Sequence, residues 1–204
     1  MTYATTAQVK AALALGVSDT TDDAQIAAAL AAAEQMVEGY CGRSFTVAGT
    51  AATARVYATP AADLVFIDDC TAITLVETDP SADDSWDGGP WTSSDWQAEP
   101  LNGLSGGRSV PYDCVRAVGD YYFPPANRAC VRVTATWGWA AVPDAVEQAT
   151  IQTAIRLWKR LDTPLGFGGG PDTGLLYVSR QIDGDVAQLL QPYRKGTMAV
   201  GGIA

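Results

Sequence analysis

One five-residue stretch of the sequence carries the pattern of a hydrolase nucleophile. Residues 103–107 read GLSGG and match the G-x-S-x-G turn, in which a serine attacks an ester or amide carbonyl. Such a serine needs a histidine to take its proton, and the chain contains no histidine. Pro111 also follows too soon for the helix that must come after a nucleophile turn. The stretch therefore predicts a glycine loop without catalytic function.

Metal and redox chemistry are also poorly served by the composition. Without histidine, the commonest general base and the commonest metal ligand are both missing. No C-x-x-C pair occurs, so neither a zinc ribbon nor a redox motif is encoded, and the cysteines are expected to be reduced and mostly buried. The cysteines are Cys41, Cys70, Cys114 and Cys130. No catalytic, metal or cofactor site is predicted, and the best carboxylate pair for a glycoside hydrolase is Asp95 with Glu99.

The glycine-rich residues 166–174 form a partial phosphate-binding pattern. Pro171 stands where the third glycine of G-x-G-x-x-G would fall, and no G-K-[ST] follows. We interpret this stretch as a flexible connection, a hinge or a segment that becomes ordered on assembly.

An acidic segment with three tryptophans is the strongest candidate for binding. Trp86, Trp91 and Trp96 alternate there with aspartates, but in a spacing that does not fit a calcium loop. Exposed indoles beside carboxylates suit a sugar, whereas aromatic side chains in general concentrate in loop packing and subunit interfaces. We favour interface or packing and keep sugar binding as the alternative. The aspartates are Asp83, Asp84, Asp87 and Asp95.

Two other places are candidate assembly contacts. Trp137 and Trp139 lie at the end of an expected strand, where both rings belong to the core or one of them faces a neighbour. Near the C-terminus, Tyr193, Arg194 and Lys195 begin a cationic and then glycine-rich tail. Such a tail is usually frayed, but in an assembly it orders against a partner.

Helices are expected to hold both ends of the chain. Thr5 with Gln8, and Asp22 with Gln25, have the spacing of capping pairs and predict two N-terminal helices, the second ending at Gly42. The second helix has apolar positions at steps of four and three, as in an amphipathic helix. These positions are Ile26, Leu30, Ala33, Val37 and Tyr40.

The middle of the chain has the period of two that predicts β-strands. Val131, Val133, Ala135 and Trp137 alternate with polar residues in the clearest of them, giving one dry and one wet face. The expected strands are Thr53–Tyr57, Leu64–Ile67, Ile73–Thr78, Ser94–Ala98, Val115–Val118 and Cys130–Trp137.

A third main helix is expected after Pro143, which suits a first helical turn, and it should stop before Pro164. A short apolar piece at residues 175–178 precedes a last short helix, capped by Asp185 with Gln188. The stripe of the third helix is Val146, Thr150, Ala154, Leu157, Trp158 and Leu161.

The expected fold class is α+β. Three main helices and a short C-terminal helix form a small bundle, with a β-rich insertion between the second and third helices. Residues 1–45 hold the N-terminal helices, 46–142 the insertion, and 143–204 the C-terminal helices and tail, as one structural unit.

Charge argues against a protein that grips nucleic acid. The net charge is −10, and residues 1–142 contain 7 Lys and Arg against 17 Asp and Glu. Phosphate binding relies on clustered basic residues, so DNA would be repelled and kept mobile. No apolar run is long enough for a membrane span and no secretory signal is visible, which predicts a cytosolic origin.

Several stretches together resemble the head-to-tail connector, or adaptor, proteins of long-tailed bacteriophages. They are spread along the whole chain in the expected order and spacing. They are the opening helix after residues 3–5, EGYCGRSF at 38–45, VRVTATWGW at 131–139 followed by Val142-Pro143, LWKR at 157–160, GFG at 166–168 and DVAQLLQPYR at 185–194. The acidic tryptophan segment and the C-terminal extension match no family pattern.

The resemblance implies a ring, commonly of twelve subunits, beneath the portal protein at the capsid vertex of the virion. Such a ring extends the channel through which double-stranded DNA passes, without sequence-specific binding, and docks a head-completion (stopper) or tail protein. The segment from Tyr193 would reach toward the portal, and helices would line the channel. Synthesis in the host bacterial cytoplasm, and no membrane partner, are implied. A carbohydrate-binding β module is the alternative; a stopper or tail terminator is expected to be smaller and mostly β.

Overall fold

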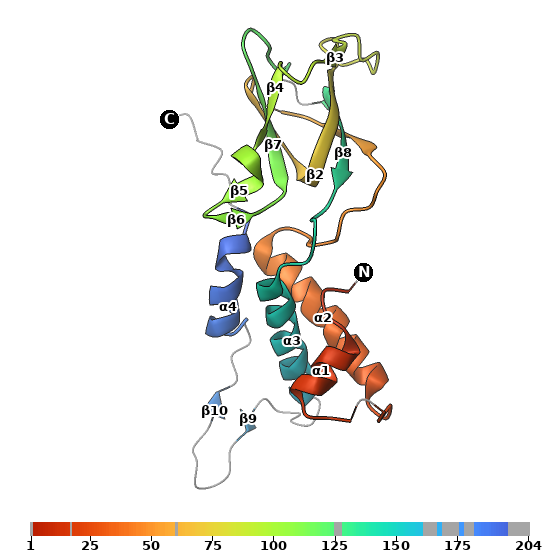
Figure 1. The fold of residues 1–204 in the computed structure, drawn as a ribbon, viewed down its shortest axis with the longest axis vertical. Coiled ribbons are helices and arrows are strands. Elements are labelled where there is room, and N and C mark those ends of the chain that lie inside the picture. The colour runs from red at the N-terminus through yellow and green to blue at the C-terminus, as the bar shows by residue number, and fades with distance from the viewer. Residues whose placement is uncertain are drawn as a thin grey trace. The chain divides into compact units, whose positions relative to one another are not determined.

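The computed structural model describes residues 2–16, 18–59, 61–124, 128–160, 167–168, 176–177 and 182–195. The chain divides into two compact units, Met1–Phe45 with Val142–Ala204, and Thr46–Ala141. Helices dominate the first unit and an antiparallel sheet the second, so the fold is mixed α+β (Figure 1). No helix in these ranges is long and apolar enough to cross a membrane.

The helical unit contains helices of two to five turns. They are α1 (Thr6–Ala12), α2 (Asp23–Cys41), α3 (Asp144–Lys159) and α4 (Gly184–Leu190), which continues into the 3-10 turn η3 (Gln191–Tyr193). Two short strands of this unit, β9 (Phe167–Gly168) and β10 (Leu176–Tyr177), pair antiparallel. Leu161, Pro164 and the remainder of the glycine-rich stretch 166–174 and of the apolar piece 175–178 lie outside the described residues, as does the tail from residue 196.

The predicted helix caps are correct in part. Thr5 and Gln8 form the expected capping box on α1, with the Gln8 N–H donating to Thr5 Oγ1 at 3.2 Å. Gly42 ends α2 in the left-handed conformation at φ 66°. The prediction for Asp22 is wrong, because its backbone is not extended (φ −102°, ψ 6°) and its side chain makes no capping hydrogen bond. Asp185 is also no cap, since it lies inside the first turn of α4 after Asp183.

Packing of the helical unit follows the apolar stripes. Ile26, Leu30 and Ala33 of α2 are buried against Ile151 and Ala154 of α3. Val37 is also buried, as expected, whereas Tyr40 stays partly exposed because it lies at the last turn. The 3.6-residue period of the sequence therefore located the buried face of α2 correctly.

The second unit is built on one antiparallel sheet with the strand order β1-β8-β2-β7-β4, and β3 added to β2. Its strands are β1 (Thr53–Tyr57), β2 (Leu64–Thr78), β3 (Pro90–Trp91), β4 (Trp96–Glu99), β7 (Tyr112–Ala117) and β8 (Val131–Trp137). A hairpin of β5 (Leu104–Ser105) and β6 (Arg108–Ser109) follows the short turn η1 (Leu101–Gly103).

Two of the expected strands are one. Leu64–Ile67 and Ile73–Thr78 belong to the continuous strand β2, whose pairing register shifts near Cys70. Such bulges bend a strand without ending it, so Asp68 and Asp69 lie within β2 and not in a turn. β3, β5 and β6 were not predicted, because two-residue strands have no period of their own.

The alternation along β8 places its apolar residues in the core of the sheet unit. Val131, Val133 and Ala135 are fully buried, whereas Arg132 and Thr134 are partly exposed. The other buried apolar residues of this core come from β2, β3, β7 and the segment before β8. They are Val65, Ile67, Cys70, Val76, Trp91, Val115, Phe123 and Cys130.

Candidate interaction surfaces

The hydrolase-like pattern lies on the exposed β5–β6 hairpin. Ser105 ends β5, and the turn residues Gly106 and Gly107 have φ values of 55° and 76°. A nucleophile serine must stand between a strand and a helix, whereas here two short strands flank the turn. The prediction of a glycine loop is confirmed. The last two glycines of the sequence match stand at turn positions with a positive φ, which glycine adopts readily.

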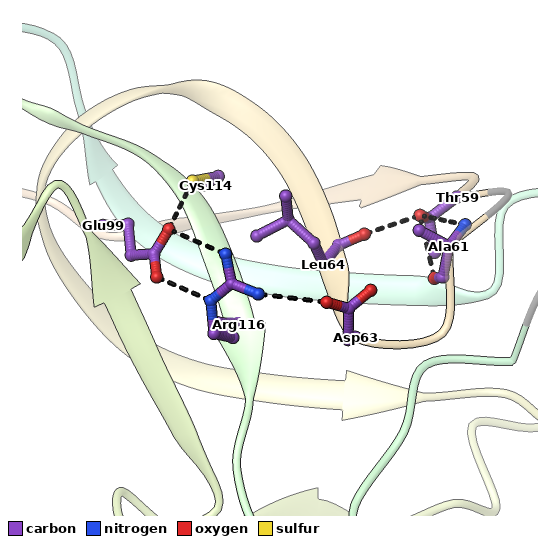
Figure 2. Close-up of polar contacts among 7 residues, drawn as sticks. All are labelled: Thr59, Ala61, Asp63, Leu64, Glu99, Cys114 and Arg116. Carbon is purple, nitrogen blue, oxygen red and sulfur yellow. Dashed lines mark hydrogen bonds and ion pairs between the residues drawn. The ribbon is translucent and has the colours of Figure 1, made fainter. Parts of the chain in front are cut away.

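The carboxylates Asp95 and Glu99 both have a pKa below the ordinary value. Figure 2 shows the Arg116 guanidinium between Glu99 and Asp63, with Arg116 Nε 2.7 Å from Glu99 Oε1 and Nη1 3.0 Å from Asp63 Oδ2. This hydrogen bond from Arg116 lowers the pKa of Glu99, and the hydroxyl of Thr92 lowers the pKa of Asp95. A glycosidase needs one carboxyl group with a raised pKa, to protonate the leaving group. This pair supplies no such acid.

Arg116 instead has a structural role in the sheet. It lies on β7 and bonds to β4 through Glu99 and to the turn before β2 through Asp63. That turn is closed by Thr59, whose hydroxyl donates to the Leu64 carbonyl at 2.8 Å (Figure 2). The cluster therefore ties three neighbouring segments together.

Acid is expected to weaken the sheet unit through two glutamate–arginine pairs. Arg132 donates two hydrogen bonds to Glu77, at 2.7 and 2.8 Å, and lowers its pKa, as Arg116 does for Glu99. A carboxyl whose pKa is lower in the folded state contributes stability that is present above its unfolded pKa of about 4.3 and lost as the pH falls through the folded pKa. The urea concentration at the unfolding midpoint should fall between pH 7 and pH 3, and it should fall less steeply for Glu77→Gln than for the parent protein. An equal slope in both proteins would contradict the role of this pair.

The three tryptophans of the acidic segment have different environments. Trp91 is 7% exposed and stacks on Phe123, with 4.8 Å between ring centroids and 16° between ring planes. Trp86 is partly exposed and lies under the Arg132 guanidinium, 4.4 Å from its ring centroid. Trp96 is partly buried against the sheet core. A common stacking platform of three exposed indoles for a sugar is therefore not formed, because Trp91 is a core residue.

A buried aspartate organises the start of the acidic segment. Asp79 is fully buried, and its Oδ2 accepts the Asp84 N–H at 2.6 Å while Oδ1 accepts the Ser81 hydroxyl at 3.2 Å. The Gly88 backbone lies very close to Thr78. A Cβ at residue 88 would lie 2.2 Å from Thr78 Oγ1 and 2.7 Å from the Thr78 carbonyl oxygen. Backbone contacts thus shape the segment, and no sequence signal indicates the role of Asp79.

Trp139 is buried, whereas Trp137 is partly exposed. Trp139 is 3% exposed, and its Nε1 donates to Asp69 Oδ2 at 2.9 Å. Trp137 is partly exposed, and the Arg55 guanidinium lies 4.5 Å from its ring centroid. Of these two candidate rings, Trp137 alone is accessible to a neighbour.

The residues that begin the C-terminal tail pack on their own helical unit. Tyr193 meets Phe45 edge-on at 6.2 Å between ring centroids, and the Arg194 guanidinium lies 5.0 Å from the Tyr40 ring centroid. The Lys195 N–H donates to the Cys41 carbonyl at 2.8 Å. The tail therefore starts from a fixed position beside the end of α2.

Two exposed features were missed by sequence reasoning. Tyr121 and Tyr122, in the segment after β7, are 48% and 64% exposed, although adjacent aromatic residues between two strands are a visible signal. Val56 of β1 is 53% exposed, on a strand whose position along the chain was predicted correctly. Its exposure depends on the position of β1 in the sheet, which the sequence does not reveal.

Two solved structures share this fold over nearly the whole chain. A chain in the neck of an empty gene transfer agent (GTA) particle, computed with C6 symmetry, has a TM-score of 0.54 and 18% identity, covering 96% of this chain and 91% of that one. A chain in the virion of the native GTA particle has a TM-score of 0.52 and 17% identity, with the same coverage. No protein-family model and no curated protein matches the sequence. The fold of this chain is therefore similar to that of chains in these particles.

Proposed function

We propose that this chain is a structural neck protein of a phage-type particle, and that it acts as a head-to-tail connector. The observation that carries the proposal is the likeness in fold, over 96% of the chain, to a chain in a particle neck. The sequence stretches that resemble phage connector proteins support the same role. The lowered pKa of both members of the best carboxylate pair, Glu99 beside Arg116 and Asp95 beside Thr92, supports a role without catalysis.

In this proposal, copies of the chain form a ring of about a dozen subunits with cyclic symmetry beneath the portal. The ring extends the channel for double-stranded DNA and docks a stopper or tail protein on its other side. The net charge of −10 supports this role, because an acidic surface repels the DNA backbone and leaves the DNA mobile. The protein is made in the host cytoplasm and ends in the virion neck.

The residues proposed for contacts are the accessible ones among the sequence candidates. Trp86, Trp96 and Trp137 would contribute to lateral contacts, because partly exposed aromatic side chains are enriched at interfaces. The tail would extend toward the portal from residues 193–195, which pack beside the end of α2. Residues 46–142 are proposed as an insertion between the helical segments 1–45 and 143–204.

The test is the native mass of the purified protein over a range of concentrations, alone and with portal protein added, followed by negative-stain imaging. We expect a closed ring of about a dozen copies, either alone or templated by the portal. A protein that stays monomeric in both samples and does not bind the portal would contradict the connector role. Sugar-dependent quenching of tryptophan fluorescence in that sample would favour a carbohydrate-binding module.

A further inference from the structure

The first strand of the sheet has one paired neighbour among the described strands and is mostly exposed. β1 is the end of the strand order and pairs with β8 alone among the described strands. Four of its five residues are exposed, with Val56 at 53%. An uncovered edge strand presents backbone donors and acceptors to which another strand can add.

The direction of the β1 backbone groups follows from two hydrogen bonds. The Tyr57 carbonyl accepts the Cys130 N–H at 3.0 Å, and the Thr53 carbonyl accepts Trp137 Nε1 at 2.8 Å, both from the β8 side. Alternate residues of a strand direct their backbone groups to opposite edges. The N–H and C=O groups of Ala54 and Val56 therefore point away from β8, to the open edge.

The last strand of the same sheet has a second edge without a partner strand among the described residues. β4 is the other end of the strand order, and the Asp95 carbonyl just before it accepts the Val118 N–H at 2.9 Å. By the same alternation, Gln97 and Glu99 direct their backbone groups to β7. The groups of Trp96 and Ala98 point outward.

The usual protection of an edge strand is missing on β1. Natural edges carry a proline, a bulge or a charged side chain that projects into the path of an added strand. β1 reads TARVY, and its single charged side chain, Arg55, is held by Asp68 Oδ2 at 2.7 Å and by the Trp137 ring. No proline, bulge or projecting charged side chain of β1 therefore blocks an added strand beside Ala54 and Val56.

We propose that β1 of one copy pairs with β4 of the next copy, so that the sheet continues from subunit to subunit around the ring. This inference rests on the proposed function, because a cyclic ring needs two different surfaces that fit each other. The two open edges meet this requirement, since they end the same sheet and each has two residues with outward backbone groups.

The test uses proline, which removes a backbone N–H and is tolerated at an edge where that N–H faces solvent. Val56→Pro removes an outward donor of β1, Ala98→Pro removes one of β4, and Val56→Thr is the matched control that keeps the N–H. We expect Val56→Thr to form rings like the parent protein and each proline variant to stay monomeric, as measured by native mass spectrometry. Circular dichroism verifies that each variant is folded.

Mixing the two proline variants gives the sharpest outcome. Val56→Pro retains an intact β4 edge and Ala98→Pro an intact β1 edge, so an equimolar mixture should form dimers that contain one copy of each and grow no further. Rings formed by either proline variant alone would overturn the inference.

Hydrogen exchange of the parent protein covers the case in which a proline variant fails to fold. The amides of Val56 and Ala98 should exchange at least tenfold more slowly in the ring than in the diluted monomer. Unchanged exchange in an intact ring would overturn the β1–β4 pairing alone and leave the connector role standing. A parent protein that forms no ring, with or without portal, would overturn both.

Discussion

Replacing Gly138 by alanine is expected to lower the free energy of unfolding by about 3 kcal/mol or more. Gly138 has a φ of 118°, which L-residues rarely adopt, and a Cβ there would lie 2.5 Å from the Thr46 carbonyl oxygen and 2.9 Å from the Ala48 nitrogen. Both neighbours are backbone atoms, which cannot move aside without breaking the hydrogen bonds between Trp139 and residues 46 and 48, at 2.9 and 2.8 Å. Urea denaturation followed by circular dichroism measures the change.

Gly107→Ala is the matched control for this substitution. Gly107 also has a positive φ, 76°, but nothing lies within 4 Å of the position of its Cβ. It should lose only about 1–2 kcal/mol, the cost of a left-handed conformation for a residue with a side chain. Equal losses in the two variants would show that the close approach at Gly138 contributes nothing.

Trp91→Ala is expected to destabilise the protein by about 3–5 kcal/mol, the range for large aromatic residues in a core. The Trp91 ring stacks on Phe123 and lies 5.2 Å from the Tyr121 ring centroid, and the side chain is 7% exposed. Its loss would leave a cavity beside β2, where Trp91 pairs with Val76. Thermal and urea unfolding report the change.

Trp86→Ala is the comparison from the same segment. Trp86 loses its contact with the Arg132 guanidinium, worth about 1 kcal/mol when partly exposed, and little packing. This variant should therefore be nearly as stable as the parent protein, and any effect of the substitution should appear in ring assembly. If Trp86→Ala were as destabilising as Trp91→Ala, the assignment of one ring to the core and the other to the surface would be wrong.

Local sequence determined much of the fold of this protein. The Thr5–Gln8 capping box, the left-handed Gly42 and the alternation along β8 were predicted correctly. Each depends on residues within a few positions of one another, so short-range hydrogen bonding and periodicity suffice to specify them. The absence of histidine likewise excludes a serine–histidine nucleophile whatever the fold, because no arrangement of this chain can supply that base.

The tertiary structure alone decided which candidate residues are accessible. Nothing local distinguishes Trp91 from Trp86, or Trp139 from Trp137; burial follows from Phe123 and Asp69, which lie 32 and 70 positions away along the chain. The continuity of β2 through Asp68 and Asp69, and the open edges of β1 and β4, likewise depend on pairing between distant strands. Long-range contacts set the order of the strands in the sheet. The sequence of an edge strand therefore has no periodic pattern that reveals its position in the sheet.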